Sequence, residues 1–191
     1  MNATDPRPAA DGLSPAWWQQ DHERWDLLRF EGIRHEAGYT IDRWAKDREH
    51  VLEALIRAPG LADHDFALFL LEQEVQRHQN SWGFNHTIEI AALLVAEHRN
   101  VQDVWPIWRA IYRSFDTWCG IPHRLLFAGG VTRAMEHVGS SGAEGRDRLL
   151  ECLRGIPPLT DHDVTTLLAK RRRHYTDILN ELDAAPGQAN A

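Results

Sequence analysis

The chain has 191 residues, of which 43% are hydrophobic and 26% are charged, and its formal net charge is −7 at pH 7. This length and composition are typical of one globular domain and exclude a collagenous or largely disordered chain. The excess of acidic residues disfavours binding to nucleic acid, because it opposes the charge of the phosphate backbone. With only two cysteines, the chain has neither a disulfide framework nor a multi-cysteine zinc ribbon, and we expect no cofactor.

The sequence carries no segment that would place it in a membrane. Its longest apolar run, residues 90–96, is far shorter than the roughly 20 residues that span a bilayer. The N-terminal residues lack the basic and then apolar pattern of a secretory signal, so we expect a cytoplasmic protein. Only two of the 21 basic residues are lysine, a bias that suggests a GC-rich bacterial genome.

Apolar residues recur at helical spacings along most of the chain, which predicts an all-α fold. No stretch alternates apolar and polar residues long enough to indicate a strand, so no sheet is expected. Short gaps that contain glycine predict antiparallel hairpins, in a helical bundle or a short HEAT-like array. About eight helices are predicted, at residues 15–31, 40–57, 63–79, 86–98, 101–118, 122–138, 144–154 and 161–183.

We expect one helical domain over residues 14–183, with disordered tails at residues 1–13 and 184–191. The helix at residues 86–98 is apolar on nearly all sides, so we expect it to be the most buried.

An aromatic stripe lies on the predicted helix at residues 101–118. Its members follow helical spacing: Trp105, Trp108, Tyr112 and Phe115. A stacking platform for bases is one reading, but apolar neighbours continue the stripe and the chain is acidic. We therefore predict that the stripe packs in the core.

The chain has 11 histidines but no His-x-x-x-His and no Glu-x-x-His, so no metal site is predicted. The tripeptide Asp-His-Asp occurs twice, at residues 63–65 and 161–163. Its His-Asp dipeptide resembles the one in HD-type phosphohydrolases, and that resemblance implies a metal-dependent hydrolase. Each tripeptide begins a predicted helix, where acidic side chains accept from free backbone N–H groups, so we interpret both as helix caps.

Two connectors between predicted helices, at residues 81–86 and 117–123, contain aromatic, histidine and cysteine side chains that a turn does not require. In an antiparallel array every second connector returns to the same end, so residues 81–86 and 117–123 should lie together. We predict a binding surface there, made by Trp82, Phe84, His86, Trp118 and His123. Cys119 with His123 and His86 is the candidate set for catalysis through a thiolate, with the two histidines expected within reach of each other.

The features favour a non-enzymatic protein-interaction module, such as an adaptor or regulatory subunit, with a protein partner of unknown identity. The alternative is a small hydrolase or metal-dependent enzyme that uses His86, Cys119 and His123 or the Asp-His-Asp turns. A third reading is a DNA-binding regulator that uses the basic run at residues 170–173, which the acidic net charge opposes.

Overall fold

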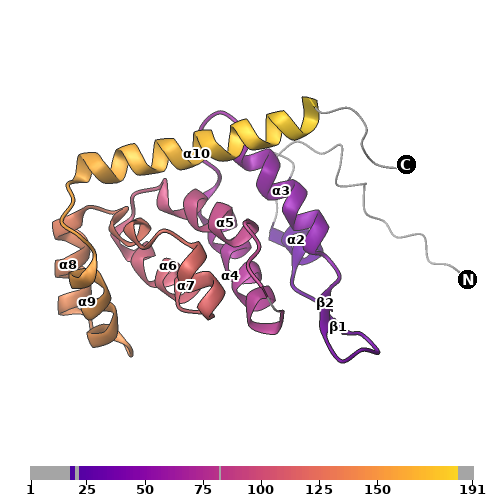
Figure 1. Cartoon of the computed structure of the whole chain (residues 1–191), viewed down its shortest axis with the longest axis horizontal. Coiled ribbons are helices and arrows are strands. Elements are labelled where there is room, and N and C mark those ends of the chain that lie inside the picture. Colours follow the sequence, from indigo (N-terminus) through magenta and orange to yellow (C-terminus); the bar gives the residue numbers. More distant parts are fainter. Residues whose placement is uncertain (1–17, 20–21, 82, 185–191) are drawn as a thin grey trace, which may run out of the picture.

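The computed structural model describes residues 18–19, 22–81 and 83–184, and these residues form a predominantly helical protein (Figure 1). The all-α prediction is confirmed. The predicted tail at residues 1–13 lies outside the described residues, as do residues 185–191 of the second tail. No helix in the described part is both long and apolar enough to cross a membrane.

The helices follow one another with short connectors, and one small sheet lies between the first helical segment, at residues 22–28, and the helix that begins at Ala45. The α-helices are α2 (His22–Trp25), α3 (Ala45–Arg57), α4 (His64–Asn80), α5 (Thr87–Ala96), α6 (Val104–Ile111), α7 (Phe115–Gly120), α8 (Val131–Ser140), α9 (Arg146–Gly155) and α10 (Asp161–Ala184). The 3-10 helices are η2 (Asp26–Leu28), η3 (Val101–Asp103) and η4 (His123–Phe127), and the strands are β1 (Gly32–Arg34) and β2 (Thr40–Asp42).

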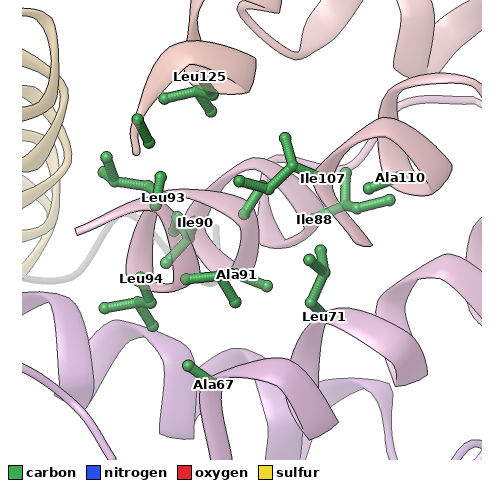
Figure 2. Close-up of a cluster of buried hydrophobic side chains, with 14 of the residues drawn as sticks. Ala67, Leu71, Ile88, Ile90, Ala91, Leu93, Leu94, Ile107, Ala110 and Leu125 are labelled. Atoms are coloured by element: carbon green, nitrogen blue, oxygen red, sulfur yellow. The ribbon is translucent and has the colours of Figure 1, made fainter. Parts of the chain in front are cut away.

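The centre of the core is α5, as its all-round apolarity predicts. All ten of its residues are buried, and Leu93 and Leu94 have no exposed surface. Helices α4 and α6 and the turn η4 pack around it, so that Leu71, Ile107 and Leu125 face it from three elements (Figure 2). Such burial is the main favourable term in folding.

The last helix, α10, runs along one side of the others and contacts α3, α5 and η4 (Figure 1). Repeats of a solenoid contact only their neighbours, so this long-range contact makes the fold a bundle. Two bases of the 170–173 run hold α10 in place: Arg171 is paired with Glu89, and Arg172 donates to both oxygens of Glu97 at 2.6 Å. Half of that basic run is therefore neutralised within the protein.

The prediction of no sheet is wrong at residues 32–42, and the predicted helix at residues 40–57 begins only at Ala45. Strands β1 and β2 pair antiparallel, with Ile33 opposite Ile41. The turn between them uses Gly38 at a φ of +89°, a conformation that costs glycine little. Three-residue strands are too short to show an alternating pattern, which is why the sequence concealed them.

Two long predicted helices are also interrupted. The helix predicted at residues 101–118 divides at Ser114, whose side chain and that of Thr117 form a capping box that begins α7. The helix predicted at residues 122–138 divides at Gly129 and Gly130. A Cβ on Gly129 would lie 2.5 Å from the Cα of Val101, so only glycine permits this approach.

Candidate binding groove

An apolar hollow lies between α6, α7 and α9. Its volume is 530 Å³, which is the size that one small molecule or a few side chains of a partner fill. Helices α6 and α7 supply its aromatic wall, and the capping box at Ser114 sets the bend between them. Helix α9 supplies the opposite wall with Arg148, Glu151 and Cys152.

Three rings form the corner of this groove. Trp108 and Tyr112 are one turn apart on α6, and their rings stack with centroids 4.8 Å apart. Trp118 of α7 meets both rings edge-on, at 6.3 Å from Trp108 and 5.7 Å from Tyr112. Edge-on and stacked pairs of this kind are the favoured aromatic geometries, so the corner is held rigidly.

Phe115 stands at the mouth of the groove as the first residue of α7, and its relative exposure is 80%. The predicted core stripe is therefore correct for Trp108, which is buried, and wrong for Tyr112 and Phe115, which are exposed. The bend at Ser114 turns Phe115 away from the face that Trp108 buries. A large exposed aromatic ring beside an apolar hollow is typical of an interaction surface.

The polar groups of the groove carry one charge of each sign. Arg148 lies 3.8 Å from the Tyr112 ring centre, and within the described residues it is paired with that ring and with no carboxylate. Glu151, on the same wall, makes no hydrogen bond or ion pair in this part of the chain. Burial raises the pKa of the Cys152 thiol, which keeps it protonated and apolar in character.

A second hollow of 450 Å³ adjoins the first across Trp118 and Cys152, and His123 lines it. The His123 ring is fixed there, because its Nε2 atom donates to the Trp118 carbonyl at 2.8 Å and its ring meets the Trp118 ring at 4.2 Å. Trp118 and His123, two residues of the predicted binding surface, therefore belong to one continuous surface.

The two predicted connectors do lie side by side. The N–H of Gly83 donates to the Asp116 carboxylate at 3.2 Å. The Phe84 ring occupies the space beside Gly120, where a Cβ would come within 2.3 Å of it. Trp82 falls outside the described residues.

His86 faces a different set of elements from His123. Its Nε2 atom lies 4.0 Å from Glu49 of α3, and its ring stacks against Tyr175 of α10. Cys119 is exposed, and no hydrogen bond joins its thiol to an imidazole in the described part of the chain. The thiolate set of Cys119, His123 and His86 is therefore not assembled as a hydrogen-bonded unit.

Both Asp-His-Asp turns cap helices, as predicted. Asp63 accepts from the N–H of Phe66 at 2.9 Å at the start of α4. Asp163 and Thr160 bond reciprocally at the start of α10. The Asp163 carboxylate accepts from the hydroxyl and the N–H of Thr160, and these two hydrogen bonds lower its pKa. His64 is bonded instead to Asp103, at 2.9 Å.

No family model, curated protein or solved structure matches this chain.

Proposed function

We propose that the chain is a non-enzymatic interaction module that binds a segment of a partner protein in the groove between α6, α7 and α9. The observation that supports this is Phe115, an aromatic side chain 80% exposed at the mouth of an apolar hollow. An exposed phenylalanine lacks the roughly 1.5–3 kcal/mol of stabilisation that burial of its side chain gives, and binding of a partner would supply it.

The groove also defines the chemistry of its partner segment. The corner of Trp108, Tyr112 and Trp118 accommodates an aromatic or large aliphatic side chain as the anchor. Arg148 lacks an anionic partner within the described residues and favours an acidic residue beside that anchor. Glu151 lies one turn further along α9 and favours a basic residue on the other flank. The expected segment is therefore an apolar anchor between an acid and a base.

The test is a selection of random peptides displayed on phage against the immobilised full-length chain. Peptides that bind should share an apolar anchor flanked by opposite charges. A synthetic peptide of that sequence, labelled with a fluorophore, then gives a dissociation constant from fluorescence polarisation.

Phe115→Asp is the informative variant, because its side chain projects into solvent and its loss leaves the core intact. It should weaken the peptide at least tenfold, which corresponds to about 1.4 kcal/mol. Leu182→Asp is the matched control: Leu182 is 66% exposed near the C-terminal end of α10, and its replacement should leave affinity unchanged. Selected peptides without a common anchor, or equal binding to wild type and Phe115→Asp, would contradict the proposal.

A further inference from the structure

A cluster of metal-ligating side chains lies on another side of the molecule, between α3 and α5. Glu49 and Glu53 are one turn apart on α3, so their carboxylates lie on one face of the helix. His86, immediately before α5, brings its imidazole to the same point. One ligand atom from each of the three residues lies within 4.8 Å of those of the other two.

Within the described residues neither Glu49 nor Glu53 forms an ion pair with an arginine or a lysine, although the charges of His50 and Arg57 oppose the rise in the pKa of Glu53. The nearest ion pair brings the His86 ring to 4.0 Å from Glu49, and Glu53 makes no hydrogen bond or ion pair in the described part of the chain. Arg57, one turn after Glu53, bonds instead to Asp183 and to the Leu179 carbonyl of α10. Burial and the neighbouring Glu49 carboxylate raise the pKa of Glu53.

Helix α10 borders the imidazole on one side. The His86 and Tyr175 rings stack at 6.2 Å with an angle of 24° between their planes. Tyr175 is itself held, because its hydroxyl donates to Glu89, which is also paired with Arg171. The imidazole therefore lies between Tyr175 and Glu49, with its Nε2 atom toward the Glu49 carboxylate.

The distances fit a small divalent ion. In a tetrahedral site with bonds of about 2.0–2.1 Å, ligand atoms are about 3.4 Å apart. The three ligand atoms lie within 4.8 Å of one another, so the two glutamate side chains would have to rotate for them to reach that spacing. Two carboxylates and one imidazole suit Zn²⁺, Mn²⁺ or Fe²⁺, whereas Mg²⁺ and Ca²⁺ prefer ligands that are all oxygen.

We propose that Glu49, Glu53 and His86 bind a divalent transition-metal ion. Three protein ligands leave at least one coordination position open to water or to a further ligand. Because the side chains of Glu49 and His86 are 31% and 44% exposed, the ion enters from solvent. This site lies on α3 and α5, whereas the proposed groove lies on α6, α7 and α9, so each stands without the other.

The test uses the full-length chain, stripped of metal with a chelator and titrated with ZnCl₂ in a calorimeter. One equivalent of Zn²⁺ should bind at micromolar or tighter concentration. Titration with Co²⁺ should produce the intense visible absorption of a tetrahedral ion, because a tetrahedral site lacks the centre of symmetry of the octahedral aqueous ion.

The variants assign the site. The double variant Glu49→Gln with Glu53→Gln and the single variant His86→Ala should each weaken Zn²⁺ at least ~100-fold, since even outer-shell losses cost 10–100-fold. These side chains are partly exposed, so circular dichroism should show intact helices. His64→Ala and His162→Ala, in the two Asp-His-Asp turns, are the matched controls and should bind normally.

Unchanged affinity in the Glu49 and Glu53 variants overturns the proposal. It is equally overturned if the wild-type chain binds Zn²⁺ only at millimolar concentration, or if His64→Ala or His162→Ala abolishes binding.

Discussion

The guanidinium of Arg148 lies 3.8 Å from the centre of the Tyr112 ring, so that α9 reaches across the groove to α6. A cation over an aromatic face is stabilised by about 0.5–1 kcal/mol at an exposed site. The ring satisfies the cation only in part, because it carries no full negative charge. The same side chain therefore closes one wall of the groove and remains available to a carboxylate from outside.

Cys152 provides a chemical probe of the groove. Its thiol lines the hollow and is half-buried, and burial raises its pKa, so it should react slowly with iodoacetamide at pH 8. The exposed Cys119 should react faster. In a Cys119→Ser variant, alkylation of Cys152 measured by mass spectrometry should slow further when a selected peptide is bound. A rate that the peptide does not change would place the peptide elsewhere.

A buried ionic network stabilises the opposite end of the molecule. Arg48 has no exposed surface, and its Nε donates to Glu74 at 2.9 Å while its other nitrogens reach Asp42 and the Leu28 carbonyl. Arg48→Met leaves the buried Asp42 carboxylate without its cation and leaves Glu74 paired with Arg77 alone, at 3.4 Å. It should lower the free energy of unfolding by about 3–5 kcal/mol in urea denaturation.

The control for Arg48 is Arg43→Ala. Its ion pair with Glu31 is about half exposed on both sides, so its loss should cost less than ~1 kcal/mol. Equal losses for Arg43 and Arg48 would show that the buried network contributes nothing beyond a surface pair.

His78 should make the stability pH-dependent. Its Nδ1–H donates to the Glu74 carbonyl at 2.8 Å, and its Nε2 accepts from the Asn85 N–H at 3.2 Å, an arrangement that only the neutral ring permits. Burial lowers the pKa of His78, and the positive charge of Arg77 lowers it further. The nearby Glu74 acts in the opposite direction and raises it. The folded state thus binds fewer protons than the unfolded state, whose histidine titrates near about 6.5.

The contribution of His78 is therefore complete above about pH 6.5 and declines as the pH falls through its lowered pKa in the folded state. Melting temperatures between pH 7.5 and 5 should fall more steeply for wild type than for His78→Gln, whose amide cannot titrate. Parallel curves would mean that His78 does not titrate in this range.

Leu94 tests the central position of α5. Its side chain has no exposed surface and lies among residues of α4 and α5 (Figure 2). Leu94→Ala should cost about 2–5 kcal/mol, because it removes apolar contacts and leaves a cavity. Leu182→Ala, at an exposed site, should change stability by no more than about 0.5 kcal/mol. A small loss for Leu94→Ala would indicate that the core closes around the missing side chain.

The sequence predicts the parts of the fold that local patterns determine. The all-round apolarity of α5, the helical spacing in α4 and α10 and the caps at Asp63 and Asp163 are each visible within a few residues. The hairpin at residues 32–42 is not visible in this way. Its strands are held partly by the contact of Asp42 with Arg48, and a buried arginine on a helix gives no signal in an apolar pattern.

The residues of the groove can likewise be predicted from the sequence only where a local pattern marks them. The sequence indicates Trp118 and His123 as binding residues, because their connector is rich in aromatic, histidine and cysteine side chains. It does not indicate Arg148 and Glu151, because only the tertiary fold brings their helix opposite α6. The exposure of Phe115 follows from the break at Ser114. The Ser-x-x-Thr spacing of residues 114 and 117 indicates a helix start at this break. The aromatic stripe continues across it and favours one unbroken helix instead.

The sequence does not single out Glu49 and Glu53, because neither belongs to a His-x-x-x-His or Glu-x-x-His pattern. Their spacing of four residues places both carboxylates on one face, yet it is common on solvent-facing helices. Only the tertiary fold shows that this face meets His86.

The most direct test of the proposed groove is an exchange of charges between Arg148 and the selected peptide. Arg148→Glu should weaken a peptide with an acidic flank at least tenfold, about 1.4 kcal/mol, in fluorescence polarisation. A peptide whose flanking acid is replaced by lysine should bind Arg148→Glu more tightly than it binds wild type, which gives a favourable coupling energy in the double-mutant cycle. If instead Arg148→Glu binds both peptides with the affinity of wild type, the groove between α6, α7 and α9 is not the site at which this protein binds its partner.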